Sequence, residues 1–168
     1  MSVQLPAGAD AIRATLARGF EHHRAGRLAE AEAAYCAVLE EEPANADALH
    51  HLGLIAFAAK AHARAVDLME AARALQPDDH RLLSNLAEVY LRADRTEEAL
   101  ACGERAVELQ PDSAAAHMNV GNALRRAGRL DEAERALSTA LALEPASARG
   151  KVNLGFARLQ RGDYASGL

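Results

Sequence analysis

The chain of 168 residues contains no tryptophan, and aromatic residues make up only 4% of it. Half of the residues are nevertheless apolar, with alanine and leucine prominent among them, so the sequence can bury a core and disorder is not expected. Alanine and leucine favour helices, whereas half-buried strands draw on aromatic and β-branched side chains. The composition therefore predicts an all-α protein.

A cationic excess is also missing, because the formal net charge is -5 at pH 7. Proteins that bind nucleic acid usually carry a basic excess that meets phosphates, so we expect no nucleic-acid partner. No apolar run approaches the roughly 20 residues of a membrane-spanning helix. Residues 1–10 lack the basic and apolar regions of a secretory signal. These absences predict a cytoplasmic protein without membrane insertion.

Residue patterns typical of catalysis or metal binding are scarce as well. The two cysteines, Cys36 and Cys102, show neither a paired framework nor metal-ligand spacing. Histidines occur as adjacent pairs, and neighbours on a helix point about 100° apart, so one pair cannot converge on one ion. Phosphate-binding loops, nucleophile elbows and metalloprotease motifs do not occur in the sequence. We expect no cofactor, no metal site and no enzymatic activity.

What the sequence does contain is a repeat of 34 residues. Four of its five prolines are spaced by that interval, namely Pro43, Pro77, Pro111 and Pro145. A period of about 20 to 50 residues is typical of repeat architectures. With each of these prolines at place 32 of its unit, the predicted layout is an extension 1–11, full units 12–45, 46–79, 80–113 and 114–147, and a partial unit 148–168.

Small residues recur at place 8 of these units, where a helix has to approach its neighbour closely. Larger side chains there would hold the two helices apart. Larger apolar residues fill the intervening places at helical spacing and are predicted to form the core. The residues at place 8 are Gly19, Gly53, Ala87, Gly121 and Gly155.

Turn and cap residues divide each unit into two helices. Gly26, Gly128 and Gly162 fall at the turn between them, where glycine tolerates the left-handed conformation that often ends a helix. Lys60 and Asp94 occupy the same place, so these two turns are expected to be strained or to differ in geometry. Candidate N-caps precede the first helices of the later units, at Asn45, Asp79, Ser113 and Ser147.

This combination of period, small-residue places and proline resembles the tetratricopeptide repeat family, from residue 12 to the end of the chain. The repeats are similar to those of bacterial tetratricopeptide scaffold proteins and of proteins like O-linked N-acetylglucosamine transferase. The resemblance implies a right-handed superhelical solenoid of antiparallel helix pairs, with about four full repeats and a terminal first helix. It also implies a scaffold that binds protein rather than an enzyme.

In this family the first helices line a concave groove, and places 2, 5, 6, 9, 12 and 13 face it. The resemblance therefore implies which residues contact a peptide in this chain. We expect contacts from nine of the polar or charged side chains at these places. They are His51, Asn85, Glu88, Arg92, Asn119, Asn122, Arg125, Arg126 and Asn153.

Two features of these groove residues suggest what the partner is. Asparagine recurs at place 6, in Asn85, Asn119 and Asn153, and a side-chain amide can pair with the main chain of an extended peptide. The alternative is that these amides bridge neighbouring helices. The groove places hold seven arginines and only two acidic residues. This excess of positive charge favours an acidic partner. The alternative is that the arginines pair locally with acids on second helices. These charged residues are Arg13, Arg24, Arg81, Arg92, Arg125, Arg126, Arg149, Asp47 and Glu88.

The leading functional hypothesis is therefore a scaffold that binds an extended peptide or partner segment. One alternative is the targeting arm of a larger enzyme such as a bacterial glycosyltransferase. Another is a self-assembling scaffold that associates through its C-terminal end, where residues 148–161 are predicted to form a first helix and residues 162–168 only begin the second. Without a complete second helix, we expect Leu154 and Phe156 to lie uncovered.

Overall fold

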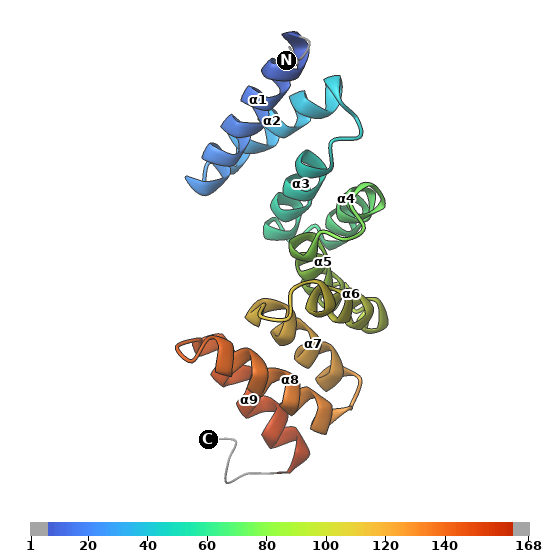
Figure 1. Ribbon diagram of the computed structural model, residues 1–168, viewed down its shortest axis with the longest axis vertical. Coiled ribbons are helices and arrows are strands. Elements are labelled where there is room, and N and C mark those ends of the chain that lie inside the picture. Colours follow the sequence, from blue (N-terminus) through green and yellow to red (C-terminus); the bar gives the residue numbers. More distant parts are fainter. Residues whose placement is uncertain (1–6, 163–168) are drawn as a thin grey trace, which may run out of the picture. The chain divides into compact units, whose positions relative to one another are not determined.

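A computed structural model describes residues 7–162, and this part of the chain is helical throughout, with no strand (Figure 1). The prediction of an all-α chain of helix pairs is confirmed. In chain order the helices are α1 (Ala7–Arg24), α2 (Leu28–Glu41), α3 (Ala46–Ala58), α4 (His62–Leu75), α5 (His80–Arg92), α6 (Thr96–Leu109), α7 (Ala114–Arg126), α8 (Leu130–Leu143) and α9 (Ala148–Arg161).

The chain divides into two compact units, at the boundary between residues 76 and 77. In the first unit, α1 pairs with α2 and α3 pairs with α4, and in each pair the helices run antiparallel (Figure 1). In the second unit, α5 pairs with α6 and α7 with α8, and α9 packs on α8. Short turns of three residues join the partners of each pair, which keeps the partners side by side.

At Gly53 and Gly121, two of the place 8 residues, the paired helices leave no room for a side chain. A Cβ atom on Gly53 would lie 2.6 Å from Cγ of Met69, and one on Gly121 would lie 2.5 Å from Cγ of Leu137. Real Cβ atoms do not come that close, so a larger residue would push the two helices apart. The small-residue pattern therefore marks the contact between first and second helices.

The turn inside each pair contains one residue in the left-handed backbone conformation, whether or not that residue is glycine. Gly26, Gly128 and Gly162 have φ values of 74°, 76° and 91°. Lys60 and Asp94 have φ values of 62° and 58°, so their turns have the same geometry rather than a different one. A side chain in this region is strained by about 1–2 kcal/mol. The strain predicted for these two turns is present.

The predicted N-caps hold the first turns of the first helices. Asn45 Oδ1 accepts a hydrogen bond from the Ala48 amide at 3.0 Å, and Asp79 Oδ1 accepts one from the Arg81 amide at 2.8 Å. Ser113 and Ser147 cap α7 and α9 in the same way. Each cap satisfies a backbone donor that would otherwise lack a partner at the start of a helix.

Each unit has a core of its own. Tyr35, Val38 and Leu52 are buried at the centre of the first unit. In the second unit, Leu137 is fully buried and packs with Leu154 of the last helix. None of the helices within residues 7–162 is both long enough and apolar enough to span a membrane.

Burial of Leu154 corrects the expectation that the C-terminal helix is bare. Leu154 is only 7% exposed because it packs against α7 and α8 in a cluster that includes Met118 and Leu137. Phe156 does remain 53% exposed, as expected, and Val152 on the same helix is 56% exposed. The predicted start of a second helix falls mostly on residues 163–168, which lie outside the described part of the chain.

Candidate functional site

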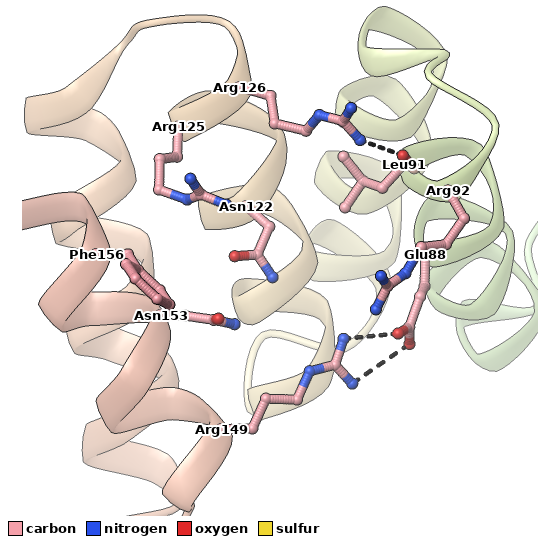
Figure 2. Close-up of a pocket in the computed structure, with 9 residues that line it drawn as sticks. All are labelled: Glu88, Leu91, Arg92, Asn122, Arg125, Arg126, Arg149, Asn153 and Phe156. Carbon is pink, nitrogen blue, oxygen red and sulfur yellow. Dashed lines mark hydrogen bonds and ion pairs between the residues drawn. The ribbon is translucent and has the colours of Figure 1, made fainter. Parts of the chain in front are cut away.

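Three first helices of the second unit line one hollow of about 250 Å³, which we call the α5–α7–α9 hollow. Figure 2 shows its walls, with three side chains from each helix. Its lining residues are Glu88, Leu91 and Arg92 from α5, Asn122, Arg125 and Arg126 from α7, and Arg149, Asn153 and Phe156 from α9.

The 34-residue period explains why these side chains meet. Glu88, Asn122 and Phe156 are separated by that interval and occupy place 9 of three consecutive repeats. Arg92 and Arg126 share place 13 in the same way. Because equivalent first helices stack beside one another, equivalent side chains form rows across them. Sequence variation along these rows sets the chemistry of the hollow.

Three polar atoms of the lining residues are buried without a hydrogen-bond partner among the described residues. They are Oδ1 of Asn122, Nε of Arg125 and Nδ2 of Asn153. Asn122 as a whole is only 9% exposed. An unpaired buried polar group is unfavourable by about 1–3 kcal/mol. One acceptor and two donors of the lining residues therefore have unused hydrogen-bonding capacity within the described part of the chain.

The arginines of the hollow differ in how they are neutralised. Arg149 Nη2 donates to Glu88 Oε1 at 2.7 Å, and Arg126 pairs with Asp94 and with the Leu91 carbonyl. Arg125 Nη1 donates to Oε1 of Gln160, a neutral group, at 3.2 Å.

Arg92 has no hydrogen bond or ion pair with any residue of the described chain. Four arginines and one carboxylate line the hollow, so its formal charge is positive by three. Asp94, at its edge, offsets one further positive charge through Arg126. The hollow therefore favours anions, with Arg92 and Arg125 lacking a carboxylate partner.

Six of the nine predicted contact residues line this hollow: Glu88, Arg92, Asn122, Arg125, Arg126 and Asn153. Arg149 lines it too, and the sequence marks Arg149 as a groove arginine by its place alone. Leu91 and Phe156 were missed because only polar and charged side chains were chosen. Their places, 12 and 9, are groove places in the repeat, so the period carries the signal that would have found them.

Asn119 differs from the expected open row of asparagines. It is 5% exposed, and its Nδ2 donates to the Ser84 carbonyl at 2.8 Å. The alternative interpretation, in which the amide bridges neighbouring helices, therefore describes Asn119, and its Nδ2 is not available to a peptide. Asn85 is half-buried and does not line the hollow.

His51 lies in the first unit, within a cluster of rings. Its ring centroid is 4.6 Å from that of Phe20, 5.5 Å from Tyr35 and 5.7 Å from His23. Its Nδ1 lies 2.9 Å from the Asp47 carbonyl oxygen. Burial raises the pKa of Tyr35 to about 12, and burial together with the nearby charge of His51 lowers the pKa of His23.

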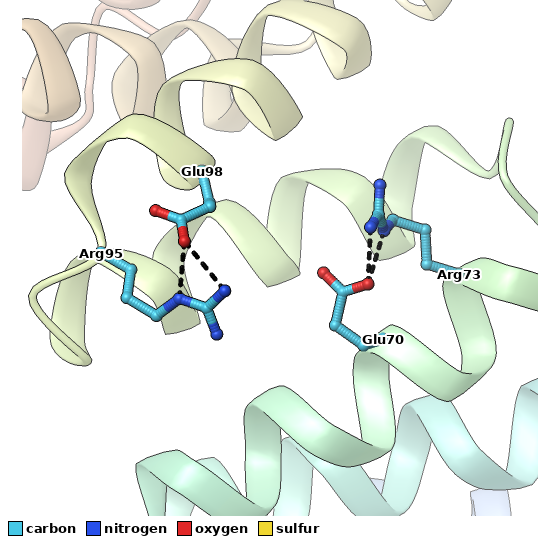
Figure 3. A network of polar contacts seen from close by, with 4 residues as sticks. All are labelled: Glu70, Arg73, Arg95 and Glu98. Carbon is cyan, nitrogen blue, oxygen red and sulfur yellow. Dashed lines mark hydrogen bonds and ion pairs between the residues drawn. The ribbon is translucent and has the colours of Figure 1, made fainter.

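Several groove arginines form local ion pairs, but their acidic partners do not lie on second helices as the alternative interpretation assumed. Arg13 pairs with Asp10 and Arg81 lies 4.0 Å from Asp79, so the partners lie on or beside first helices rather than on second helices. Second helices have local pairs of their own. Figure 3 shows one in each unit, Arg73 with Glu70 and Arg95 with Glu98.

Histidine, cysteine and acidic side chains are the usual protein ligands of metal ions. Within residues 7–162, no group of three or more of them is arranged to hold an ion. The chemical groups that the hollow presents are thus hydrogen-bond donors and acceptors, guanidinium groups, one carboxylate and one exposed aromatic ring. Such a set is suited to binding.

Comparison with known families identifies the chain. Models of the tetratricopeptide repeat match residues 16–80 and 120–168, and another such model matches residues 78–143. The chain therefore belongs to the tetratricopeptide repeat family, whose members act as protein-interaction scaffolds. No curated protein matches the chain.

Solved structures with the same architecture are numerous. MamA (residues 41 to the end) from Desulfovibrio magneticus RS-1 has a TM-score of 0.83 at 21% identity, with 94% of this chain and 89% of that chain covered. MamA AMB-1 has a TM-score of 0.80 at 25% identity, with coverage of 92% and 91%. YrrB, described as a tetratricopeptide protein with an unusual peptide-binding site, has a TM-score of 0.78 at 23% identity, with coverage of 97% and 88%. These similarities are in fold.

Proposed function

We propose that this chain binds an extended peptide segment of a partner protein in the α5–α7–α9 hollow. The observation that carries the proposal is that three side chains lining one hollow each hold a buried polar atom without a partner among the described residues. Native proteins seldom leave such groups unpaired, and each such group calls for an explanation. A ligand that pairs with all three atoms provides one.

A peptide backbone has the complementary groups. Its N–H group can donate to Asn122 Oδ1, and its carbonyl oxygen can accept from Asn153 Nδ2 or Arg125 Nε. Contacts of this kind do not depend on the side chains of the peptide. They therefore position the backbone, while the rest of the hollow selects the sequence.

The remaining lining residues favour a peptide that carries acidic and apolar side chains. Arg92 and Arg125 lack a carboxylate partner, and charge complementarity of this kind speeds association and selects partners. Phe156, which lines the hollow, exposes apolar surface, and Val152 on the same helix α9 is exposed as well. The described peptide-binding site of YrrB, a protein with the same fold, is consistent with this use of the repeats.

Replacing both amides tests the proposal. Peptides would be selected from a displayed random library against the whole chain, and their Kd values measured by fluorescence polarisation. Asn122→Ala combined with Asn153→Ala should raise Kd about tenfold or more, because each hydrogen bond contributes roughly 0.5–1.5 kcal/mol. Helicity should not change, since neither Asn122 Oδ1 nor Asn153 Nδ2 has a hydrogen-bond partner among the described residues.

Thr139→Ala is the matched control, because this residue is exposed on α8 and does not line the hollow. The control variant should bind as the unmodified chain does. Equal Kd values for the double variant and the unmodified chain would contradict the proposal. Failure of the library to yield any binding peptide would contradict it as well.

A further inference from the structure

The ion pair between Glu88 and Arg149 joins two first helices that are not consecutive repeats. Glu88 lies on α5 and Arg149 on α9, so the pair reaches past α7 (Figure 2). The contact is bidentate, with Nη2 to Oε1 at 2.7 Å and Nη1 to Oε2 at 3.5 Å. The other ion pairs of the described residues lie within one helix or between nearer segments.

Both members of this pair line the hollow, and both are open to solvent. The Arg149 side chain is 52% exposed and the Glu88 side chain is 25% exposed. Glu88 is also the one carboxylate among nine lining residues, facing four arginines. An incoming anion therefore meets a negative charge at the mouth of an otherwise cationic hollow.

We propose that Glu88 is a specificity-determining residue, which holds Arg149 until a carboxylate side chain of the bound peptide takes its place. This inference rests on the proposed peptide binding and adds the class of side chain that is recognised. The peptide carboxylate accepts from Arg149, and from Arg92 or Arg125, which have no carboxylate partner of their own. Glu88 then turns to solvent.

Competition with Glu88 makes the hollow selective. A peptide without a carboxylate gains nothing from Arg149, because Glu88 already satisfies that guanidinium. A peptide with a carboxylate must displace an exposed ion pair, and such pairs contribute little to stability, so the exchange is feasible. Arg92 and Arg125 add contacts that Glu88 does not provide, which favours the exchange.

A purely structural role for the pair makes the opposite prediction. If Glu88 serves only to hold α5 and α9 together, its loss should loosen the hollow and weaken every peptide alike. If Glu88 instead binds a basic residue of the partner, its loss should weaken basic peptides most. The charge dependence of binding therefore separates competition from both alternatives.

The experiment uses the whole chain and selected peptides with amidated C-termini, so that side chains supply the only carboxylates. Each peptide is compared with its Glu→Gln form. Glu88→Gln should tighten the binding of the acidic peptide by about two- to fivefold, the range expected when one exposed ion pair no longer competes. It should leave the Kd of the neutral peptide unchanged.

Glu134→Gln is the matched control, since it breaks the pair of Glu134 with Arg158 on helices of the same unit, outside the hollow. It should change neither Kd. Unchanged or weaker binding of the acidic peptide by the Glu88→Gln chain would overturn the inference. Peptides that depend on Asn122 and Asn153, yet bind equally well as acidic and neutral forms, would overturn the inference alone and leave the proposed function standing. Loss of all dependence on the two asparagines would overturn both.

Discussion

At the residue scale, the ring cluster of the first unit brings titratable side chains of two repeats together. His23 Nδ1 and the Tyr35 hydroxyl are buried without partners, and the rings of His23 and His51 meet edge to face. Burial and the neighbouring imidazole both disfavour a charged His23, so its pKa falls below the ordinary value of 6.5. The folded state therefore prefers this side chain neutral.

We expect this preference to make the stability of the first unit depend on pH. The unfolded chain takes up the His23 proton near pH 6.5, whereas the folded chain does so only at lower pH. The unfolded state thus binds more protons in this window, so the free energy of unfolding decreases as pH falls below about 6.5. Urea denaturation at about pH 7.5 and about pH 5.5 measures the change.

His23→Gln provides the comparison, because it keeps a polar side chain but cannot titrate. The loss of stability between the two pH values should be smaller in this variant than in the unmodified chain. An equal loss in both would show that other histidines cause the effect and that the environment of His23 does not disfavour its charge.

Side-chain partners are the part of the site that the sequence predicts least well. Asn119 and Asn122 lie three residues apart on α7, and both were predicted to contact a peptide. Asn119 meets the Ser84 carbonyl, while Asn122 Oδ1 meets no donor. The difference depends on which group of the preceding repeat faces each amide. The place of a residue in the repeat predicts which equivalent side chains lie in one row across the first helices. Only the packed structure shows which hydrogen-bond partner each side chain has.

At the element scale, caps and turns follow local sequence closely. Asn45, Asp79, Ser113 and Ser147 were predicted as N-caps from residue type and place, and each accepts the backbone hydrogen bonds that define a cap. The left-handed turns were predicted with equal ease where glycine is present. Where it is not, the repeat geometry still imposes the left-handed residue, because tertiary packing outweighs the local preference.

Relieving that strain should stabilise the chain. Lys60→Gly removes the Cβ atom from a left-handed residue and keeps the turn, but it also increases the entropy of the unfolded chain. Strain relief is the larger effect, so we expect a gain of roughly 0.5–1 kcal/mol. Thermal denaturation followed by circular dichroism measures the gain as an increase in Tm.

Gly128→Lys is the reverse change at the equivalent place, and it should lower Tm. Asp94 is less suitable for this comparison because its side chain pairs with Arg126. A decrease in Tm for Lys60→Gly would show that the lysine stabilises its turn despite the positive φ.

At the scale of the whole molecule, one period organises both the core and the candidate site. Places that hold small residues bring paired helices together, as Gly53 and Gly121 show, and places that face the groove bring Glu88, Asn122 and Phe156 into one hollow. The repeat family and the helix pairs could be predicted from spacing, and most lining residues could be predicted from the groove places that the family resemblance implies. The repeat boundaries and the superhelical handedness stay predictions.

What spacing could not predict is how charge is distributed among partners. Seven groove arginines were counted as available, yet Arg126 and Arg149 are held by Asp94 and Glu88. A long arginine side chain can reach several acidic residues. Which one it pairs with depends on the geometry of the folded chain and not on its place in the repeat. The charge that remains for a ligand is therefore a property of the folded chain.

The central claim is that a peptide lies in the α5–α7–α9 hollow. Heteronuclear NMR of the labelled chain, titrated with a selected peptide, tests this most directly through the side-chain signals of Asn122, Asn153 and Arg125. We predict that the Asn153 amide and the Arg125 Nε–H signals shift the most, with smaller shifts for signals of second helices, such as the Arg135 Nε–H on α8. Shifts confined to second helices, with the Asn122, Asn153 and Arg125 signals unmoved at saturation, would contradict the account.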